Sequence, residues 1–447
     1  MQIKEIMQAC GAERLCGNEE LEVTSYSNDT RTIQAGALYI PIVGEVFDGH
    51  QFISQAFKNG AVATLTSRKN LPLEGTMLYV DDTLKAIQQL AHYVRMKAKV
   101  QVVGITGSVG KTSTRDLVGA VVASHYSTLK TEGNFNNHLG LPLTILRYKN
   151  EKAFVLEMGM NHEGEISLLS QIARPNIGVI TNVGTAHIGN LGSREGILKA
   201  KMEIVDGFEK GAILIVNNDN DLLHKLVQNN TLNDYTIKTF GIENISDVNG
   251  QNICLYQDYS TFEYQGVHFR INVPGSHFVL NALCAISVGE CMNIPLEKMA
   301  KAIENFKLTK NRMDIERIGR GMTLIDGTYN ANLDSMISSL NVLGQYQNRK
   351  VAVLADMLEL GDFSYDLHYQ AGQSCLENKV DLLVCIGKEA KAIVEGAKGV
   401  QTIVHFENNQ DAIAYLHEHL QDEDIILVKG SNGMKLKEIV SDLKENR

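Results

Sequence analysis

A glycine-rich segment at residues 104–114, GITGSVGKTST, has the composition of a phosphate-binding loop. It follows an apolar run typical of a buried strand and precedes a helical pattern, which is the context that such a loop requires. Glycines let backbone N–H groups surround phosphate oxygens, and the helix N-terminus adds partial positive charge. We expect Lys111 to reach the β- and γ-phosphates of a bound nucleotide and the Thr112 hydroxyl to ligate Mg²⁺. The general motif has glycine where this chain has Ile105, so an ordinary glycine-rich turn is the alternative interpretation.

Two further polar residues stand where apolar, strand-like runs end. Glu157 ends the run in AFVLEMGM, and His187 follows NIGVITNVG. The carboxyl ends of parallel strands face the crevice where ligands bind. Glu157 is expected to hold Mg²⁺ opposite Thr112, because Mg²⁺ takes one or two carboxylates together with phosphate oxygens. A neutral His187 imidazole could ligate a second metal. A solvated strand end and a loop histidine bonded to backbone are the alternatives.

Helical segments carry three more candidates. Lys199 and Lys201 lie in ILKAKMEI, and Asn281 lies in GSHFVLNALCAIS. From the residues alone, a solvated helix face is the favoured interpretation for the lysines, and a polar helix start for Asn281. No spacing suggests a Ser–His–Asp or Cys–His constellation, so hydrolysis through a covalent intermediate is unsupported.

The elements that position these residues predict an α/β protein of three domains. Residues 1–97 alternate short strands and helices as a small α/β domain. Residues 98–308 hold apolar strand runs separated by helices, which predicts a central phosphate-loop domain with a parallel, mononucleotide-binding sheet. The more polar stretch 229–273 is expected to be an antiparallel insertion. Residues 309–447 begin a fresh alternation of five strands with helices, which predicts a Rossmann-like, doubly wound sheet.

Composition narrows the class of protein. The chain has 447 residues, a net charge of −10, 44% hydrophobic and 21% charged residues. This excludes wholesale disorder and argues against broad nucleic-acid binding. No apolar run approaches the ~18 residues of a membrane span, and the charged N-terminal stretch excludes a secretory signal. Seven cysteines without a C-x-x-C pair predict free thiols in a reducing cytoplasm and no structural zinc.

Several motifs taken together resemble the Mur ligase family across essentially the full length of the chain. Within that family they are most similar to members that add D-alanyl-D-alanine to UDP-N-acetylmuramoyl-tripeptide. No single motif would be specific, but their combination in this order is. The motifs are YSNDTRTIQAGALYIPIVGEVFDGHQFI, GITGSVGKTST, GNFNNHLGLPLTIL, LEMGMNHEGEI, TNVGTAHIGNLGSREGILKAKMEI, GSHFVLNAL, NRMDI, DGTYNANLDSM and ADMLELGD.

The resemblance implies an ATP-dependent acid–amino-acid ligase that forms ADP and phosphate. ATP would phosphorylate the tripeptide carboxylate, and the D-Ala-D-Ala amine would attack the resulting acyl phosphate. Phosphoryl transfer between two anions requires positive charge rather than a nucleophilic side chain, which suits Lys111 and Mg²⁺. The implied partners are UDP-MurNAc-tripeptide and D-Ala-D-Ala, for a cytoplasmic monomer in peptidoglycan synthesis. Cell-wall biogenesis, cell shape, cell division and the cell cycle would depend on it.

The resemblance also implies site residues. At the nucleotide it implies Gly107, Ser108, Val109, Gly110, Lys111, Thr112, Ser113, Asn281, Arg312 and Asp326. For two Mg²⁺ ions it implies Thr112, Glu157, His187 and Lys201, with Lys201 carbamylated and Lys111, Lys201 and His187 catalytic. For the substrates it implies Asp29, Thr30, Arg31, Gly49, His50, Asn136, Asn137, Asn330 and Asn332.

The chain departs from the family pattern at a few positions. Gly327 replaces the second acid of the D-D-[ST]-Y-N-A-N-P segment, and Leu333 replaces its proline. Asn432 stands where many relatives have arginine, and Phe278 where related ligases have asparagine. Two alternatives therefore stay open, another Mur-type ligase and a diverged nucleotide-binding paralogue that does not ligate. A D-N-P-R segment is absent, which disfavours the lysine- or diaminopimelate-adding ligases, and folylpolyglutamate synthetases lack the first domain.

Overall fold

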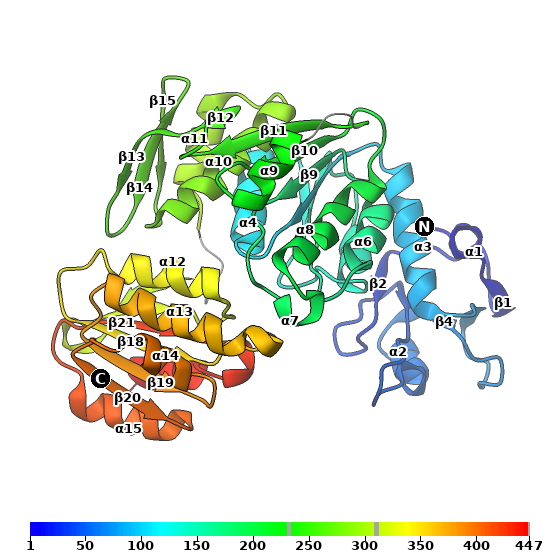
Figure 1. The fold of residues 1–447 in the computed structure, drawn as a ribbon. Coiled ribbons are helices and arrows are strands. Elements are labelled where there is room, and N and C mark those ends of the chain that lie inside the picture. Colours follow the sequence, from blue (N-terminus) through cyan, green and yellow to red (C-terminus); the bar gives the residue numbers. More distant parts are fainter. Residues whose placement is uncertain (230–233, 308–312, 446–447) are drawn as a thin grey trace.

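The computed structural model describes residues 1–229, 234–307 and 313–445, and its sheets follow one another along the chain (Figure 1). A five-stranded, a seven-stranded and a six-stranded sheet are each built from one stretch of sequence, with a small three-stranded sheet beside the second. The predicted α/β class with three domains is confirmed. The exact domain boundaries remain predictions.

The N-terminal sheet has the order β1-β5-β4-β3-β2, with β1 antiparallel to β5 and the other pairs parallel. Helix α3 is capped by Asp82, whose side chain accepts the N–H groups of Leu84 and Lys85. Near its other end, Arg95 donates to the carbonyl of Ala173 in the central domain at 2.7 Å, so α3 joins the two domains. The elements are α1 Ile3–Cys10, β1 Glu13–Cys16, β2 Ser25–Ser27, β3 Ala37–Tyr39, η1 Gly49–Phe52, α2 Ile53–Lys58, β4 Ala61–Thr66, β5 Thr76–Tyr79 and α3 Thr83–Lys97.

The central sheet is parallel throughout, in the order β12-β11-β10-β9-β6-β8-β7. The chain runs from β6 to one side through β7 and β8, then crosses to the other side at β9. The carboxyl end of β6 is therefore a topological switch point, where α/β sheets bind ligands. The elements are β6 Gln101–Thr106, α4 Lys111–Ala123, β7 Thr128–Lys130, α5 Gly140–Ile145, β8 Ala153–Glu157, α6 Glu165–Ala173, β9 Ile177–Ile180, α7 Ile188–Leu191, α8 Arg194–Met202, η2 Glu203–Gly207, β10 Ile213–Asn217, α9 Asp221–Asn229, β11 Thr236–Gly241, β12 Val248–Asn249, α10 Ser276–Cys291 and α11 Leu296–Glu304.

The antiparallel insertion expected at 229–273 is shorter than predicted. Only β13 Gln251–Leu255, β14 Ser260–Tyr264 and β15 Val267–Ile271 pair antiparallel. The preceding strands β11 and β12 instead extend the central sheet in parallel. The prediction was wrong for β11 because a strand near the sheet edge is only partly buried, so it has the mixed pattern typical of antiparallel strands.

The C-terminal sheet has the order β16-β17-β21-β18-β19-β20. Its five predicted strands are present and parallel, and β16 adds an antiparallel edge strand that the sequence did not indicate. Helices α12 and α13 lie toward the central domain, and α15 lies on the other side of the sheet (Figure 1). The elements are β16 Asp314–Arg317, η3 Gly319–Gly321, β17 Thr323–Asp326, α12 Leu333–Leu343, β18 Lys350–Ala355, η4 Gly361–Phe363, α13 Ser364–Glu377, β19 Leu382–Ile386, α14 Lys391–Gly396, β20 Thr402–Phe406, α15 Asn409–His419, β21 Ile425–Lys429, η5 Asn432–Met434 and α16 Lys437–Glu445.

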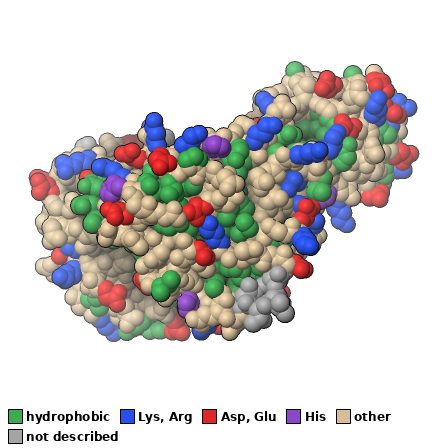
Figure 2. Space-filling model, turned by 90° about the horizontal axis from the view of Figure 1, so that it is seen from above, with side chains coloured by type: hydrophobic (Ala, Val, Ile, Leu, Met, Phe, Trp, Pro, Cys, Tyr) green, Lys and Arg blue, Asp and Glu red, His purple; other side chains and the backbone are tan. Residues whose placement is uncertain are grey.

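The surface shown in Figure 2 mixes acidic and basic side chains without a broad area of one sign. Within the described ranges, none of the helices combines the length and apolar composition needed to cross a membrane. All seven cysteines are unpaired thiols.

Candidate nucleotide and metal site

The phosphate loop connects β6 to α4 and requires glycine at two positions. A Cβ at Gly107 would lie 1.9 Å from the Thr181 hydroxyl oxygen, so only glycine lets the loop approach β9 so closely. Gly110 has a left-handed backbone with φ of 78° immediately before α4. The Lys111 ammonium donates to the carbonyl of Gly107 at 2.7 Å, which holds it against the loop. The predicted strand–loop–helix is thus formed.

The loop is held by the segment that follows β9. The Asn182 side-chain oxygen accepts the N–H groups of Ser108 and Val109, each at 2.9 Å. The Ser108 hydroxyl in turn accepts the N–H of Gly184 at 3.0 Å. Asn182 was not predicted as a site residue, although it lies in the TNVGTAHIG motif. Its two hydrogen bonds fix the loop before α4 begins.

Glu157 lies at the end of β8 directly beside the phosphate loop, as its strand-end position predicted. One carboxylate oxygen accepts from the Thr112 hydroxyl at 3.0 Å and from Arg115 at 3.2 Å, and the other accepts from Asn136 at 2.8 Å. The residue is only 2% exposed. A hydroxyl and a carboxylate on a cavity wall suit Mg²⁺, which fills its other positions with phosphate oxygens and water.

Arg115 is a buried member of this site that sequence reasoning missed. Its side chain is 3% exposed and bonds both Asp116, at 2.9 Å, and Glu157. It also donates to the carbonyl of Gly133 at 2.9 Å, in the loop that leads to Asn136. Arg115 therefore ties the Glu157 carboxylate to the neighbouring loop. Arg115 directly follows the GKTST motif, and this position was the one sign in the sequence that it could belong to the site. The number of charged residues gives no such information.

His187 and Lys201 differ in their exposure to the cavity. His187 lies on a cavity wall, and its Nδ1 is 2.7 Å from the Glu359 carboxylate of the C-terminal domain. Burial and the Lys111 charge lower the pKa of His187, which favours the neutral ring that a metal needs. Lys201 is 1% exposed, and burial lowers its pKa far below the usual lysine range. The solvated-face interpretation is wrong for Lys201 and correct for Lys199, which is exposed and pairs with Glu163.

A cavity of about 490 Å³ is lined by the phosphate loop, by Glu157 and His187, and by residues of the C-terminal domain. An adjoining cavity of about 290 Å³ lies between His187, Lys111 and C-terminal loops. The predicted residues that line the larger cavity are Ser108, Val109, Gly110, Lys111, Thr112, Ser113, Asn136, Asn137, Glu157, His187, Asn281, Asn330 and Asn332.

Asn281 lies within helix α10 rather than at its start, so that prediction was wrong. Its side-chain oxygen accepts from the Thr114 hydroxyl at 3.0 Å, which links α10 to α4. Phe240, His277 and Phe278 also line this cavity. Apolar rings beside an amide form a suitable environment for a planar base.

The C-terminal residues reach the cavity through the start of α12. Asn332 caps this helix and accepts the N–H of Ser335 at 2.9 Å. Lys429 donates to the carbonyl of Asn330 at 3.1 Å. Asp326, by contrast, is buried, and its carboxylate accepts the hydroxyl and N–H of Thr328. Gly327, which replaces the second acid of the family segment, also lines the cavity.

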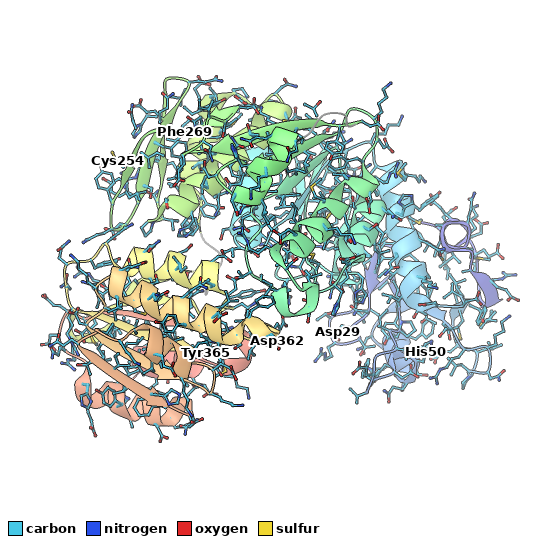
Figure 3. The ribbon with its side chains drawn as sticks, in the orientation of Figure 1. Asp29, His50, Cys254, Phe269, Asp362 and Tyr365 are labelled. Atoms are coloured by element: carbon cyan, nitrogen blue, oxygen red, sulfur yellow. The ribbon has the colours of Figure 1, made fainter. Side chains whose placement is uncertain are left out.

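The N-terminal substrate candidates lie in a different domain from the cavity. The Asp29 carboxylate pairs with Arg31, and this lowers the pKa of Asp29 to about 2. His50 is bonded to Asp48 and accepts the N–H of Ser67. Figure 3 shows Asp29 and His50 on the N-terminal domain, with Asp29 nearer to α7 in that view. The predicted residues that do not line the cavity are Asp29, Thr30, Arg31, Gly49, His50, Gly107, Lys201 and Asp326, and Arg312 lies outside the described residues.

Within the described part of the chain, no three His, Cys, Asp or Glu side chains converge into a metal site. Thr112 and Glu157 supply one hydroxyl and one carboxylate beside the phosphate loop, a pair that Mg²⁺ can complete with ligand phosphates and water. The site therefore has the donors for a phosphate-bound cation and lacks a closed structural metal cage.

The fold and this site define a ligase of the Mur family, and the chain belongs to that family. Three family models match in succession: the Mur ligase family catalytic domain at residues 22–102, the Mur ligase middle domain at 105–289, and the Mur ligase glutamate ligase domain at 311–432. Membership makes the chain an ATP-dependent ligase.

Relatives that match over nearly the full length of the chain have more specific names than the family models. The chain is 38% identical to the UDP-N-acetylmuramoyl-tripeptide–D-alanyl-D-alanine ligase of Bacillus subtilis, over 96% of this chain and 94% of that protein. It is 33% identical to the Escherichia coli enzyme of the same name, over 96% and 95%. A crystal structure of MurF from Acinetobacter baumannii superposes with a TM-score of 0.91 at 30% identity, covering 99% and 98%. MurF from Thermotoga maritima in complex with ADP gives 0.83 at 26% identity, over 96% and 99%.

Proposed function

We propose that this protein joins D-alanyl-D-alanine to UDP-N-acetylmuramoyl-tripeptide at the expense of ATP, giving the UDP-MurNAc-pentapeptide of peptidoglycan synthesis. The observation that carries the proposal is a single cavity lined by the phosphate loop and Glu157 of the central domain together with Asn330 and Asn332 of the C-terminal domain. A cavity shared by the two domains is a place where a nucleotide and two further substrates can meet.

The residues support a division of tasks. Lys111 and the loop N–H groups neutralise the transferring phosphoryl group, as its charge requires. Asn136 and Asn137 lie on the cavity wall beside Glu157, where they can orient the tripeptide carboxylate for attack on ATP. The acyl phosphate so formed is then attacked by the dipeptide amine, and phosphate leaves. Asn281 would bind the base of the nucleotide, and Asp29, Thr30, Arg31, Gly49 and His50 the UDP end of the substrate.

We further propose that Mg²⁺ is held by Thr112 and Glu157, and a second ion by His187 with a carbamylated Lys201. Bound Mg²⁺ supplies positive charge to the phosphates. The lowered pKa of Lys201 supports carbamylation, because only a neutral amine reacts with CO₂. With Nδ1 of His187 engaged by Glu359, the other ring nitrogen remains for a metal. Arg312 is proposed to reach the nucleotide phosphates. Asp326 is proposed to support nucleotide binding by holding the turn at Thr328.

The proposal includes a cytoplasmic monomer with domains at 1–97, 98–308 and 309–447. Seven unpaired cysteines suit a reducing compartment.

The test is ATP-dependent phosphate release with UDP-MurNAc-tripeptide, with and without D-Ala-D-Ala. We expect release to require both substrates and the product to gain the mass of the dipeptide. ATP binding without such release would favour the diverged paralogue, which the Gly327 departure suggests. Release with a different amine, such as lysine or diaminopimelate, would instead favour another Mur-type ligase.

A further inference from the structure

The segment 181–191, which runs from the end of β9 through α7, contacts the phosphate loop. Thr181 donates to the carbonyl of Val109 at 2.8 Å, and Gly184 donates to the Ser108 hydroxyl at 3.0 Å. Asn182 accepts two loop N–H groups. Any group that holds this segment in place therefore also influences the position of the phosphate loop.

Asp334 of the C-terminal domain bonds this same segment from the other side. One carboxylate oxygen accepts both the N–H of Thr185 at 2.9 Å and its hydroxyl at 3.1 Å. Thr185 is 8% exposed, so these bonds are largely shielded from water. Arg194 donates to the carbonyl of Val183 and adds positive charge near Asp334, although its main partner is Asp221. Charge-assisted bonds in such surroundings are about twice as strong as neutral ones.

A second contact between the domains lies one turn further along. The Glu359 carboxylate contacts Nδ1 of His187, and the backbone carbonyl of Glu359 accepts the N–H of Gly189. A Cβ on Gly189 would lie 2.8 Å from the Glu359 carbonyl oxygen and from the Gly361 nitrogen. The close approach of these two backbones therefore depends on Gly189 having no side chain.

We propose that Asp334 and Glu359 are positioning residues that seat the C-terminal domain on the segment 181–191. Asp334 lies two residues after Asn332, which caps α12. The helix end that Asp334 anchors therefore carries Asn330 and Asn332 to the wall of the larger cavity. Glu359 and His187 both line the smaller cavity, so the second contact forms part of its wall.

Gly184 provides a sharp test of this seating. The three atoms nearest to a Cβ placed on Gly184 all belong to the Asp334 carboxyl group, the closest at 2.2 Å. Gly184→Ala should therefore push Asp334 away without altering it. In the double variant Gly184→Ala with Asp334→Ala, the collision is absent, so the added methyl group should cost nothing further. This suppression would not occur if either change acted only by loosening the fold.

The direct measurement is hydrogen–deuterium exchange of the Thr185 amide, which donates to Asp334. We expect roughly tenfold faster exchange in each single variant and no further acceleration in the double variant. Asp411→Ala, which removes an exposed acid of α15 on the other side of the C-terminal sheet (Figure 1), is the charge-matched control and should leave Thr185 unchanged. If Asp334→Ala does not fold, Asp334→Ser replaces it in the same comparison, because its shorter side chain also lacks the carboxylate oxygen nearest to the added methyl group.

The kinetic consequence rests on the ligase reaction proposed above. kcat should fall about tenfold in the single variants while the KM for ATP changes less than about threefold, because Asn182 still holds the phosphate loop. Unchanged Thr185 exchange in both single variants, or strictly additive effects in the double variant, would overturn the proposal. The exchange measurement needs no substrate, so a failure of the proposed reaction would be recognised separately.

Discussion

Arg115→Met tests whether the buried charges around Glu157 stabilise the central domain. The substitution removes the cation between Glu157 and Asp116 but keeps a side chain of similar length. Asp116 keeps Lys130 at 2.9 Å, whereas the side-chain partners that Glu157 keeps among the described residues are neutral, the Thr112 hydroxyl and the Asn136 amide. Both Arg115 and Glu157 are at most 3% exposed, so Glu157 becomes a buried charge without a counterion.

Removing one partner of a buried pair costs about 3–5 kcal/mol. For a domain of about 200 residues, 1 kcal/mol corresponds to about 2–4 °C, so the melting temperature should fall by roughly 6–20 °C. The assay is thermal unfolding followed by circular dichroism. Arg147→Met is the matched control, because Arg147 pairs with Glu132 on the surface, where the two side chains are 47% and 61% exposed. Its expected cost is below about 1 kcal/mol.

The reasoning is refuted if Arg115→Met and Arg147→Met melt within about 2 °C of each other. The Glu157 charge would then be compensated by groups other than Arg115. An intermediate result for Arg115→Lys, which keeps the charge but loses the planar fork, is expected alongside the large loss in the methionine variant.

Three further results are expected. Glu157→Gln should lower kcat/KM by roughly 100-fold or more, and isothermal titration with Mg²⁺ and ADP should show weaker metal binding. The melting temperature should change little, because Arg115 still pairs with Asp116. Lys201→Ala should lose most ligase activity, whereas Lys199→Ala, an exposed neighbour, should retain it in the same phosphate-release assay. Burial and the Lys429 charge lower the pKa of His277 to about 4, so between pH 6.5 and 4 the unfolded chain binds a proton there that the folded protein does not. The contribution of His277 to stability should therefore be complete above pH 6.5 and decline toward pH 4, and urea titrations should find a smaller decline in His277→Gln.

Local patterns were sufficient for most elements of the fold. The phosphate loop, Glu157 and His187 were all identified from strand ends, because the carboxyl end of a parallel strand is a position that sequence defines. The apolar runs likewise predicted the parallel strands of both large sheets. Strand β11 was misassigned because partial burial near a sheet edge resembles antiparallel alternation. Asn281 was misplaced because helix α10 is apolar over most of its surface and gives no sign of where it begins.

The residues that sequence reasoning missed act through partners far away in the chain. Apart from its place after GKTST, nothing in the sequence distinguished Arg115 from the other charged residues. Its role depends on β8, which places Glu157 against α4. Asn182 holds the phosphate loop from the next strand of the sheet, and no spacing rule connects it to Ser108 and Val109. Asp334 and Glu359 reach Thr185 and His187 across a domain boundary, a separation of 149 and 172 residues.

The sequence by itself determined the class of protein, because its motifs specify a phosphate loop, two parallel-sheet domains and the residue types of a Mur ligase. Only the tertiary structure decided which charges are buried. Lys199 and Lys201 lie two residues apart on one helix, yet the first is solvated and the second is enclosed. Burial depends on what other segments pack against a helix face, and the distance between Asp334 and Gly184 depends on how two domains meet. Neither quantity is present in a local pattern, because both arise from contacts between residues that the chain alone keeps far apart.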